Sequence, residues 1–188
     1  VLSFFLALGK MSKNPLLNKP CSAYIFFFRG TPLLIQIYFI YFGLPQFNPA
    51  LTIKSAFVAA LIAYTLNSAA YLAENIRAGI QSIDRGQYEA AKALGMTYRQ
   101  TMQLIILSQA IKNILPALLN EVISLLKETS ISGYIGLMDL TKGGDIIRSN
   151  TYEAFLPLIA VAIIYLAFVM LLSTFVSKLE RRLRSSER

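Results

Sequence analysis

Polar and ionisable side chains recur inside segments that are otherwise apolar, and these residues could do chemistry. Two groups are Tyr64, Asn67, Ser68, Tyr71, Glu74 and Asn75, and further along Asn120, Glu121, Ser124, Lys127 and Glu128. At about 100° per residue, the members of each group fall within about 120° of a helix circumference. Because an ionisable group in hydrocarbon is costly, it usually faces a cavity or a partner. Two such stripes on neighbouring helices predict a hydrated path.

The charges of these stripes indicate what such a path could take. Glu74, Glu121 and Glu128 stand against Lys127, so an ammonium group would be favoured, and every free amino acid carries one. Arginine or lysine would gain further from a cationic side chain. The substrate-path candidates are Arg29, Thr31, Asn67, Tyr71, Glu74, Glu121, Ser124, Lys127, Glu128 and Asp139.

The ionisable candidates also have a structural interpretation, which the sequence leaves open. Glu121, Lys127 and Glu128 could form a buried ionic set that only holds helices together. Glu74 and Arg77 could anchor a helix end at the membrane interface, with their side chains reaching toward water.

Several kinds of catalysis are excluded by composition. Cys21 is the only cysteine and there is no histidine, so the chain cannot form an internal disulfide, a Cys/His zinc site, or a Cys/His or Ser/His catalytic pair. The sequence also has no Gly-x-x-x-x-Gly-Lys-Ser/Thr phosphate loop. We therefore expect no catalytic, cofactor-binding or metal-binding residues.

Composition places the chain in a membrane. It is 55% hydrophobic and 15% charged, with a mean hydropathy of +0.54, which is too apolar for an ordinary soluble domain. We expect one all-α membrane domain over residues 1–188, a helix bundle with spans at about 1–9, 22–44, 55–76, 114–135 and 154–177. Residues 1–9 are too short to cross, so we interpret them as the end of a first span that begins before this sequence.

Two of the predicted segments carry strong breaking signals. Arg29-Gly30-Thr31-Pro32 interrupts the span 22–44, which predicts a kink or a late helix start. Backbone groups freed at a kink need partners, so Arg29 and Thr31 could be purely structural. Between the last two spans, Gly143 and Gly144 among charged residues predict a loop that contains Asp139 and Arg148.

The net charge of +8 predicts an orientation rather than a nucleic-acid partner, because the basic residues are spread between hydrophobic runs. The positive-inside rule places lysine and arginine on the cytoplasmic side. One orientation puts 13 of the 18 there: Lys10, Lys13, Lys19, Arg77, Arg85, Lys92, Arg99, Lys112, Lys178, Arg181, Arg182, Arg184 and Arg188. The C-terminus and the segment around Glu89 are then cytoplasmic.

Residues 82–110 form a polar segment rich in helix-forming residues. It contains Glu89-Ala90-Ala91, then Gly95 after three residues, and Ile105 and Leu107 further on. Small alanines permit close approach of another protein, Glu89 supplies a charge, and Gly95 lets the chain turn. Thr97 to Gln100 is spaced as a capping box that restarts a helix. The segment is typical of a docking knob, although Glu-Ala-Ala alone is more often an ordinary solvated helix.

This spacing resembles the signature of permease subunits of binding-protein-dependent ABC importers. The family pattern ends in Leu-Pro, whereas this chain has Leu107-Ser108. Further matches are to the polar amino acid branch: Arg29-Gly30-Thr31-Pro32-Leu33-Leu34, Ala73-Glu74-Asn75-Ile76-Arg77-Ala78-Gly79-Ile80, Gln109-Ala110-Ile111-Lys112 and Lys127-Glu128-Thr129-Ser130.

The resemblance implies the fold of ABC importer type I permeases, with five spans in the intact protein, in the bacterial inner membrane. It implies a separate ATPase that binds ATP and Mg²⁺, a second permease subunit, identical or a sister chain, and an extracytoplasmic amino acid binding protein. The ATPase would be engaged by Glu89, Ala90, Ala91, Leu94 and Gly95.

Two other classes of function are weighed against this one. A membrane-embedded enzyme could use Glu121, Glu128 or Asp139 as acid and base, and it would be active without an ATPase. A channel that uses the same carboxylates would give flux that ignores ATP.

Overall fold

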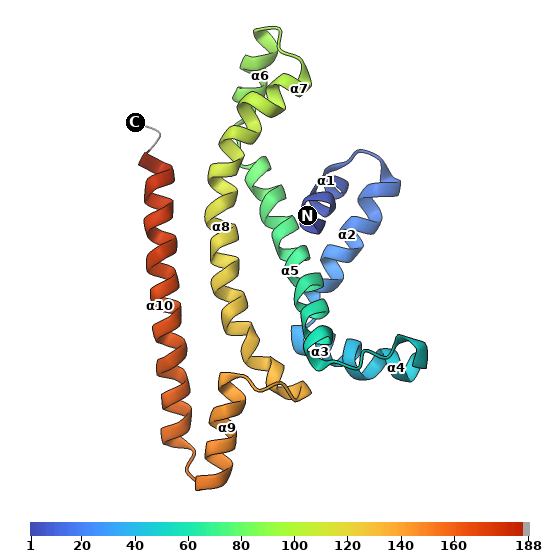
Figure 1. Ribbon diagram of the computed structural model, residues 1–188. Coiled ribbons are helices and arrows are strands. Elements are labelled where there is room, and N and C mark those ends of the chain that lie inside the picture. Colours follow the sequence, from blue (N-terminus) through green and yellow to red (C-terminus); the bar gives the residue numbers. More distant parts are fainter. Residues whose placement is uncertain (186–188) are drawn as a thin grey trace. The chain divides into compact units, whose positions relative to one another are not determined.

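The chain is helical in a computed structural model that describes residues 1–185 (Figure 1), with side chains described as far as Arg181. The elements are α1 (Leu2–Met11), α2 (Pro15–Gly30), α3 (Leu33–Tyr38), η1 (Phe39–Gly43), α4 (Leu44–Phe47), η2 (Pro49–Leu51), α5 (Ala56–Gln81), α6 (Arg85–Ala93), α7 (Tyr98–Gln100), η3 (Thr101–Ile106), α8 (Leu107–Glu128), η4 (Thr129–Ile135), α9 (Leu140–Thr151) and α10 (Phe155–Ser185). No strand occurs among the described residues, so the all-α prediction is confirmed. The side chains of Arg182 and Arg184, and all of Arg188, lie outside the described residues.

Three stretches of the described chain are long and apolar enough to cross a membrane. They are Ala56–Gln81, Tyr98–Ile135 and Phe155–Arg181. The second is a continuous stretch of 38 residues, so the latter part of the predicted segment 82–110 and the predicted span 114–135 belong to one helical stretch. The count of five spans stays a prediction.

The predicted span 22–44 is broken at the site of its breaking signal. Pro15–Gly30 and Leu33–Phe47 are bent by 106° from each other. Pro32 has no backbone N–H and disfavours helical geometry in Thr31, so the helix cannot continue through this pair. The interruption at residues 29–32 is therefore a sharp bend.

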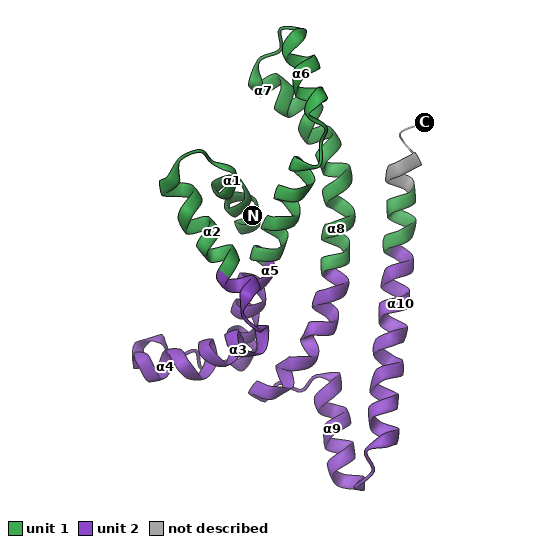
Figure 2. Cartoon of the chain, turned by 180° about the vertical axis from the view of Figure 1, so that it is seen from behind, with its two compact units in different colours: residues 1–26, 69–121, 176–188 green, residues 27–68, 122–175 purple. Residues whose placement is uncertain are grey.

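The chain divides into two compact units (Figure 2). Unit 1 consists of residues 1–26, 69–121 and the part from Val176 onward, and unit 2 of residues 27–68 and 122–175. In unit 1, Ile80 and Ile83 pack with Ile106, Ala110 and Ile114. A Cβ atom at Gly79 would overlap Ile114 Cγ1, so glycine permits this close approach of α5 to α8.

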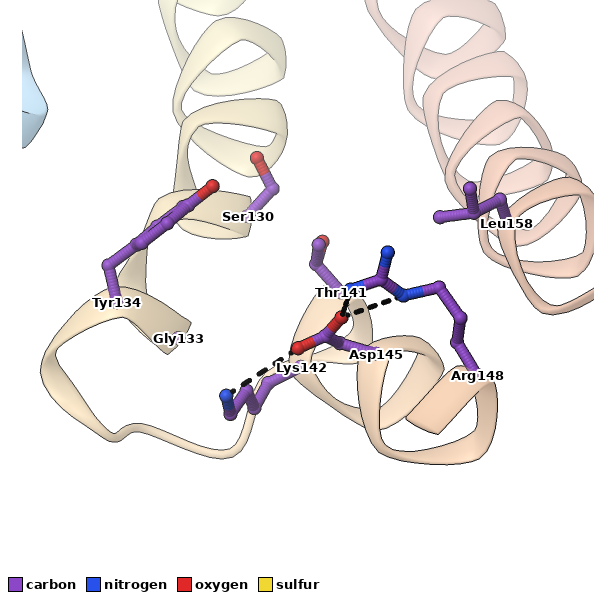
Figure 3. A pocket seen from close by; sticks show the side chains of 8 residues that line it. All are labelled: Ser130, Gly133, Tyr134, Thr141, Lys142, Asp145, Arg148 and Leu158. Carbon is purple, nitrogen blue, oxygen red and sulfur yellow. Dashed lines mark hydrogen bonds and ion pairs between the residues drawn. The ribbon is translucent and has the colours of Figure 1, made fainter. Parts of the chain in front are cut away.

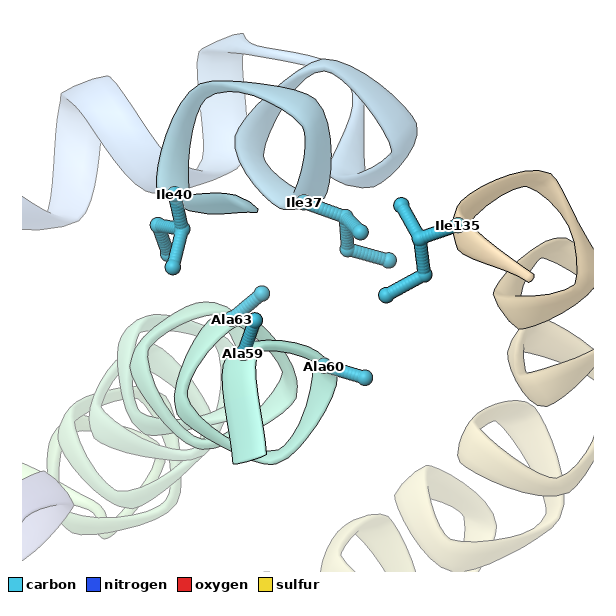
Figure 4. Packing of buried hydrophobic residues seen from close by; sticks show 6 residues of the cluster. All are labelled: Ile37, Ile40, Ala59, Ala60, Ala63 and Ile135. Atoms are coloured by element: carbon cyan, nitrogen blue, oxygen red, sulfur yellow. The ribbon is translucent and has the colours of Figure 1, made fainter. Parts of the chain in front are cut away.

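The core of unit 2 joins large side chains to small ones. Ile37 and Ile40 lie against Ala59, Ala60 and Ala63 of α5, and Ile135 joins them from η4 (Figure 4). Alanines four residues apart let helix backbones approach closely. In lipid the hydrophobic effect does not drive helices together, so this close van der Waals packing is what stabilises their association.

The predicted loop from Asp139 to Arg148 is wrong, because residues Leu140–Thr151 form helix α9. Asp139 starts it, since its Oδ1 accepts from the backbone N–H of Lys142 at 2.7 Å. Gly144 is buried where a Cβ atom would lie 2.5 Å from Val161 Cγ2 of α10. Gly144 therefore permits close packing of α9 against α10, and this packing overrides the low helix propensity of glycine.

Candidate coupling segment and polar groups of the spans

Helix α6 is closed at both ends by its own sequence. Asp84 caps its start, because the Asp84 carboxylate accepts from the N–H of Gly86 at 2.6 Å. At its end, Gly95 adopts φ +75°, its N–H donates to the carbonyl of Lys92, and the N–H of Met96 donates to the carbonyl of Ala91. This pair of bonds is a Schellman motif, in which glycine carries no penalty for the left-handed conformation.

The next helix starts at once. Thr97 Oγ1 accepts from the N–H of Gln100 at 3.3 Å, and Gln100 Oε1 accepts from the N–H of Thr97 at 2.9 Å. The predicted capping box is confirmed, as is the turn at Gly95. Two helical pieces thus meet at a short, fully defined reversal between Leu94 and Thr97.

We call the residues presented to solvent at this reversal the knob: Glu89, Ala90, Leu94, Gly95 and Tyr98. All five are exposed, and the side chains of Leu94 and Tyr98 keep 81% and 76% of their surface accessible. Large apolar side chains this exposed, rimmed by polar residues, are typical of a surface that a partner covers.

The inner side of the same segment is fixed to η3 and α8. Ala91 is 1% exposed, and the Tyr88 hydroxyl lies 3.2 Å from Met102 Sδ. Gln109 Nε2 donates to Gln87 Oε1 at 3.1 Å. Burial, with a smaller contribution from Tyr98, raises the pKa of Tyr88, so its hydroxyl stays protonated. The knob is therefore not a loose loop but part of unit 1.

Among the substrate-path candidates, Glu74 lies in an ion-pair cluster in unit 1. Its carboxylate is 3.0 Å from Lys10 Nζ of α1 and 2.5 Å from Arg77 Nη2 on its own helix. The cluster joins α1 to α5. Tyr71 and Glu121 also belong to unit 1, and both are half-buried.

In unit 2, Thr31 and Asn67 meet around a residue that the sequence analysis missed, Gln36. Gln36 Nε2 donates to Thr31 Oγ1 at 2.8 Å and to the Phe28 carbonyl at 2.9 Å. Asn67 Nδ2 donates to Gln36 Oε1 at 2.9 Å and to the same Phe28 carbonyl at 3.1 Å. Gln36 and Asn67 are only 5% and 4% exposed. Arg29 lies nearby in the chain on the last turn of α2 and is exposed.

This amide network satisfies the bend. In an unbroken helix the Phe28 carbonyl would accept from residue 32, but Pro32 has no N–H. The two amides supply the missing donors in a region where water is scarce. Gln36 could have been found by the rule that singled out Asn67, because it is a lone amide within the apolar run 33–44.

Glu128 and Asp139 flank η4 in unit 2. The Tyr64 hydroxyl donates to the Glu128 carbonyl at 3.0 Å. Glu128 Oε2 and Asp139 Oδ2 are buried and have no hydrogen-bond partner among the described residues. Ser124 is half-buried and Lys127 is exposed on the same helix. A buried carboxylate oxygen without a donor is costly, so this place favours a bound cation.

These features define an all-α membrane subunit with an exposed, rigidly held knob, and comparison with known proteins identifies its class. The family model described as "Binding-protein-dependent transport system inner membrane component" matches residues 1–185. The chain therefore belongs to this family of transport permeases, and it is a multi-pass membrane protein. Membership implies partners of two general kinds, an ATPase and a binding protein.

Individual relatives refine this class. GlnP of Rickettsia typhi, a permease protein assigned to a glutamine transport system, is 44% identical over 184 residues, which are 97% of this chain and 83% of GlnP. The arginine transport system permease protein ArtQ of Bacillus subtilis is 44% identical over 188 residues, all of this chain and 84% of ArtQ.

Solved structures agree. A crystal structure of an amino acid ABC transporter with histidines contains a chain that is 50% identical and superposes with a TM-score of 0.89, over 96% of this chain and 83% of that one. The MetNI methionine transporter, at 20% identity and a TM-score of 0.73 over 97% and 84% of the two chains, shares the fold. The resemblance to the polar amino acid branch of ABC importer permeases is thereby confirmed.

Proposed function

We propose that this chain is the permease subunit of an ATP-driven amino acid importer, and that it receives the motion of a separate ATPase through the knob. One observation carries the proposal: the segment has an exposed surface and a buried inner side. The exposed surface consists of Glu89, Ala90, Leu94 and Tyr98, and the buried Ala91 holds it rigidly against the rest of unit 1. A surface that is both uncovered and rigidly held suits the transmission of movement.

The route of that movement follows the chain. Tyr98 begins the helical stretch of 38 residues that ends at Ile135. This stretch carries Glu121 and Glu128 and leads directly to Asp139. A push on the knob would therefore act on the helix that bears half of the membrane carboxylates, and two such subunits rocking about a central site would give alternating access.

The assembly we propose follows the family. ATP and Mg²⁺ belong on the partner ATPase, since this sequence has no phosphate loop. Two permease subunits, identical or sister chains, would enclose the path, and a binding protein would deliver substrate from outside. The knob and the C-terminus would face the cytoplasm of a bacterial cell.

The substrate we propose is a free amino acid. The relatives named above are assigned to glutamine and arginine systems, and the crystal structure contains histidines. The buried, partnerless oxygens of Glu128 and Asp139 support an ammonium or guanidinium group as the feature recognised in unit 2. Arg29, Thr31, Asn67, Tyr71, Glu74, Glu121, Ser124 and Lys127 stay the other candidates for the path.

The experiment is a copurification of tagged permease with coexpressed ATPase. Leu94→Ala and Glu89→Ala should each lower the ATPase recovered, by about tenfold together, because they remove an exposed apolar anchor and its charged neighbour. Gln103→Ala is the matched control, since Gln103 is exposed on η3 outside the knob. Full recovery with both changes would refute docking through the knob.

A further inference from the structure

A pocket of about 510 Å³ lies in unit 2 between η4, α9 and the start of α10. Among the residues that line it are Ser130, Tyr134 and Thr141, which carry hydroxyl groups, and Arg148, which carries a guanidinium group (Figure 3). Its size is in the range of small-molecule sites. It is separate from the knob, and none of these four residues was among the predicted site residues.

The pocket carries a net positive charge from three side chains of α9. Asp145 lies between two cations: its Oδ2 is 3.7 Å from Lys142 Nζ, and its Oδ1 accepts from both Nε and Nη2 of Arg148. Two bonds to one oxygen fix the plane of the guanidinium group while leaving other N–H groups for a ligand. The longer contact leaves Lys142 able to turn toward an anion.

The fold places these charges on one side of α9. Residues 142, 145 and 148 are spaced three apart, so they share a helix face. Gly144 packs directly against Val161 of α10, which seats the helix on its neighbour. A Cβ atom at Gly133 would lie only 3.1 Å from Lys142 Cβ, so η4 and its hydroxyls are held close to the charged face.

We infer that this pocket binds the α-carboxylate of a free amino acid, with Arg148 and Lys142 as its anion partners and Ser130 as a further donor. The inference rests on the proposed function of amino acid import. A planar guanidinium group matches a carboxylate through two parallel bonds. The pocket thus recognises the group that all amino acids share.

Its neighbourhood supports this assignment. Glu128 and Asp139, whose partnerless oxygens favour a cation, belong to the same unit and flank η4 in the chain. A site for the carboxylate and a site for a cationic group are therefore built on consecutive segments, α8, η4 and α9. Together they would read both charges of an amino acid.

The test compares two ligands in the assembled transporter, held in lipid nanodiscs without ATP or binding protein. L-arginine and agmatine share the guanidinium group and an amine, but agmatine lacks the carboxylate. We expect arginine to bind about tenfold more tightly than agmatine, and Arg148→Met to abolish that difference. Lys54→Met, which removes an exposed charge of unit 2 outside the pocket, should leave the difference intact.

Equal affinities in the wild type, or an unchanged difference in Arg148→Met, would overturn the inference. Inorganic phosphate should not displace arginine; if phosphate displaces it and agmatine binds as well as arginine, the pocket is a phosphate site and the inference is wrong. If the Arg148→Met transporter does not assemble, Arg148→Lys is used instead, since lysine keeps the positive charge but cannot form two parallel bonds to a carboxylate. Arginine binding should weaken about threefold or more, and unchanged binding counts against the inference.

Uptake separates this inference from the proposed function. If the wild type shows no ATP-dependent amino acid uptake, the proposed function fails. If uptake is present and Arg148→Met supports it at the wild-type rate and substrate affinity, the pocket assignment alone fails.

Discussion

The backbone N–H of Met96 donates to the carbonyl of Ala91 at 3.1 Å, and this bond ties the turn after α6 to the last turn of the helix. Ala91 is also the buried residue on which the segment rests. Ala91 therefore accepts the bond that ends α6 and is also buried beneath that helix, while its neighbour Ala90 faces solvent. Docking and anchoring are divided between adjacent alanines.

That division predicts opposite effects of one substitution at two positions. Ala91→Leu should destabilise the permease by about 1–3 kcal/mol, because a buried site has no room for the larger side chain. Ala90→Leu should leave the thermal unfolding midpoint unchanged and lower ATPase recovery, because it obstructs the docking surface. Differential scanning fluorimetry and copurification measure the two effects. Equal loss of stability at both positions would contradict the assignment of faces.

Gln36→Leu should destabilise unit 2 by about 1–3 kcal/mol, because the Phe28 carbonyl and Thr31 hydroxyl lose a donor or partner in an apolar setting. The double variant with Asn67→Leu should cost less than the sum of the single changes, since both amides serve one network. Gln46→Leu, at an exposed glutamine of α4, is the matched control and should have little effect. Strict additivity would show that the amides act separately.

Glu74→Gln separates bracing from transport. Losing the pairs with Lys10 and Arg77 should lower stability by about 1 kcal/mol, because the cluster is partly exposed and screened. Substrate preference should not change. The measurement is a thermal melt beside uptake competition with arginine, glutamine and glutamate, with Glu153→Gln as an exposed control. A switch in preference at normal stability would place Glu74 in the path.

Glu128→Gln and Asp139→Asn should act on substrate choice instead. Removing a buried charge that favours a cation should reduce the preference for arginine over glutamate by about tenfold. Uptake competition in proteoliposomes measures this ratio. A wild-type transporter that already prefers glutamate would contradict recognition of a cationic side chain.

Local signals explain what the sequence could predict. Two confirmed features are the capping box of Thr97 and Gln100 and the turn at Gly95. Both depend on bonds within a few residues, so they can be predicted without knowing the fold. The bend at Pro32 is likewise a property of proline itself. These features include the turn that shapes the knob.

The rest depends on contacts between distant segments. Lys10 and Glu74 are 64 positions apart, and the sequence near either residue does not predict their ion pair. Gly143 and Gly144 carry a turn signal, yet both lie in helix α9, where Gly144 packs closely against Val161 of α10. Gln36 is buried, and its partners are the freed Phe28 carbonyl, Thr31 and, 31 positions away in the sequence, Asn67.

The central claim is that the knob receives motion from an ATPase, and ATP hydrolysis stimulated by substrate-loaded binding protein tests it most directly. Gly95→Ala disfavours the φ of +75° by about 1–2 kcal/mol, and Glu89→Ala removes the exposed charge. In the double variant we expect the ATPase to keep its basal rate while stimulation and uptake are lost, whereas Gly143→Ala, at a glycine with open space around it, keeps both. Stimulated hydrolysis coupled to uptake at the wild-type level in the double variant would contradict the account.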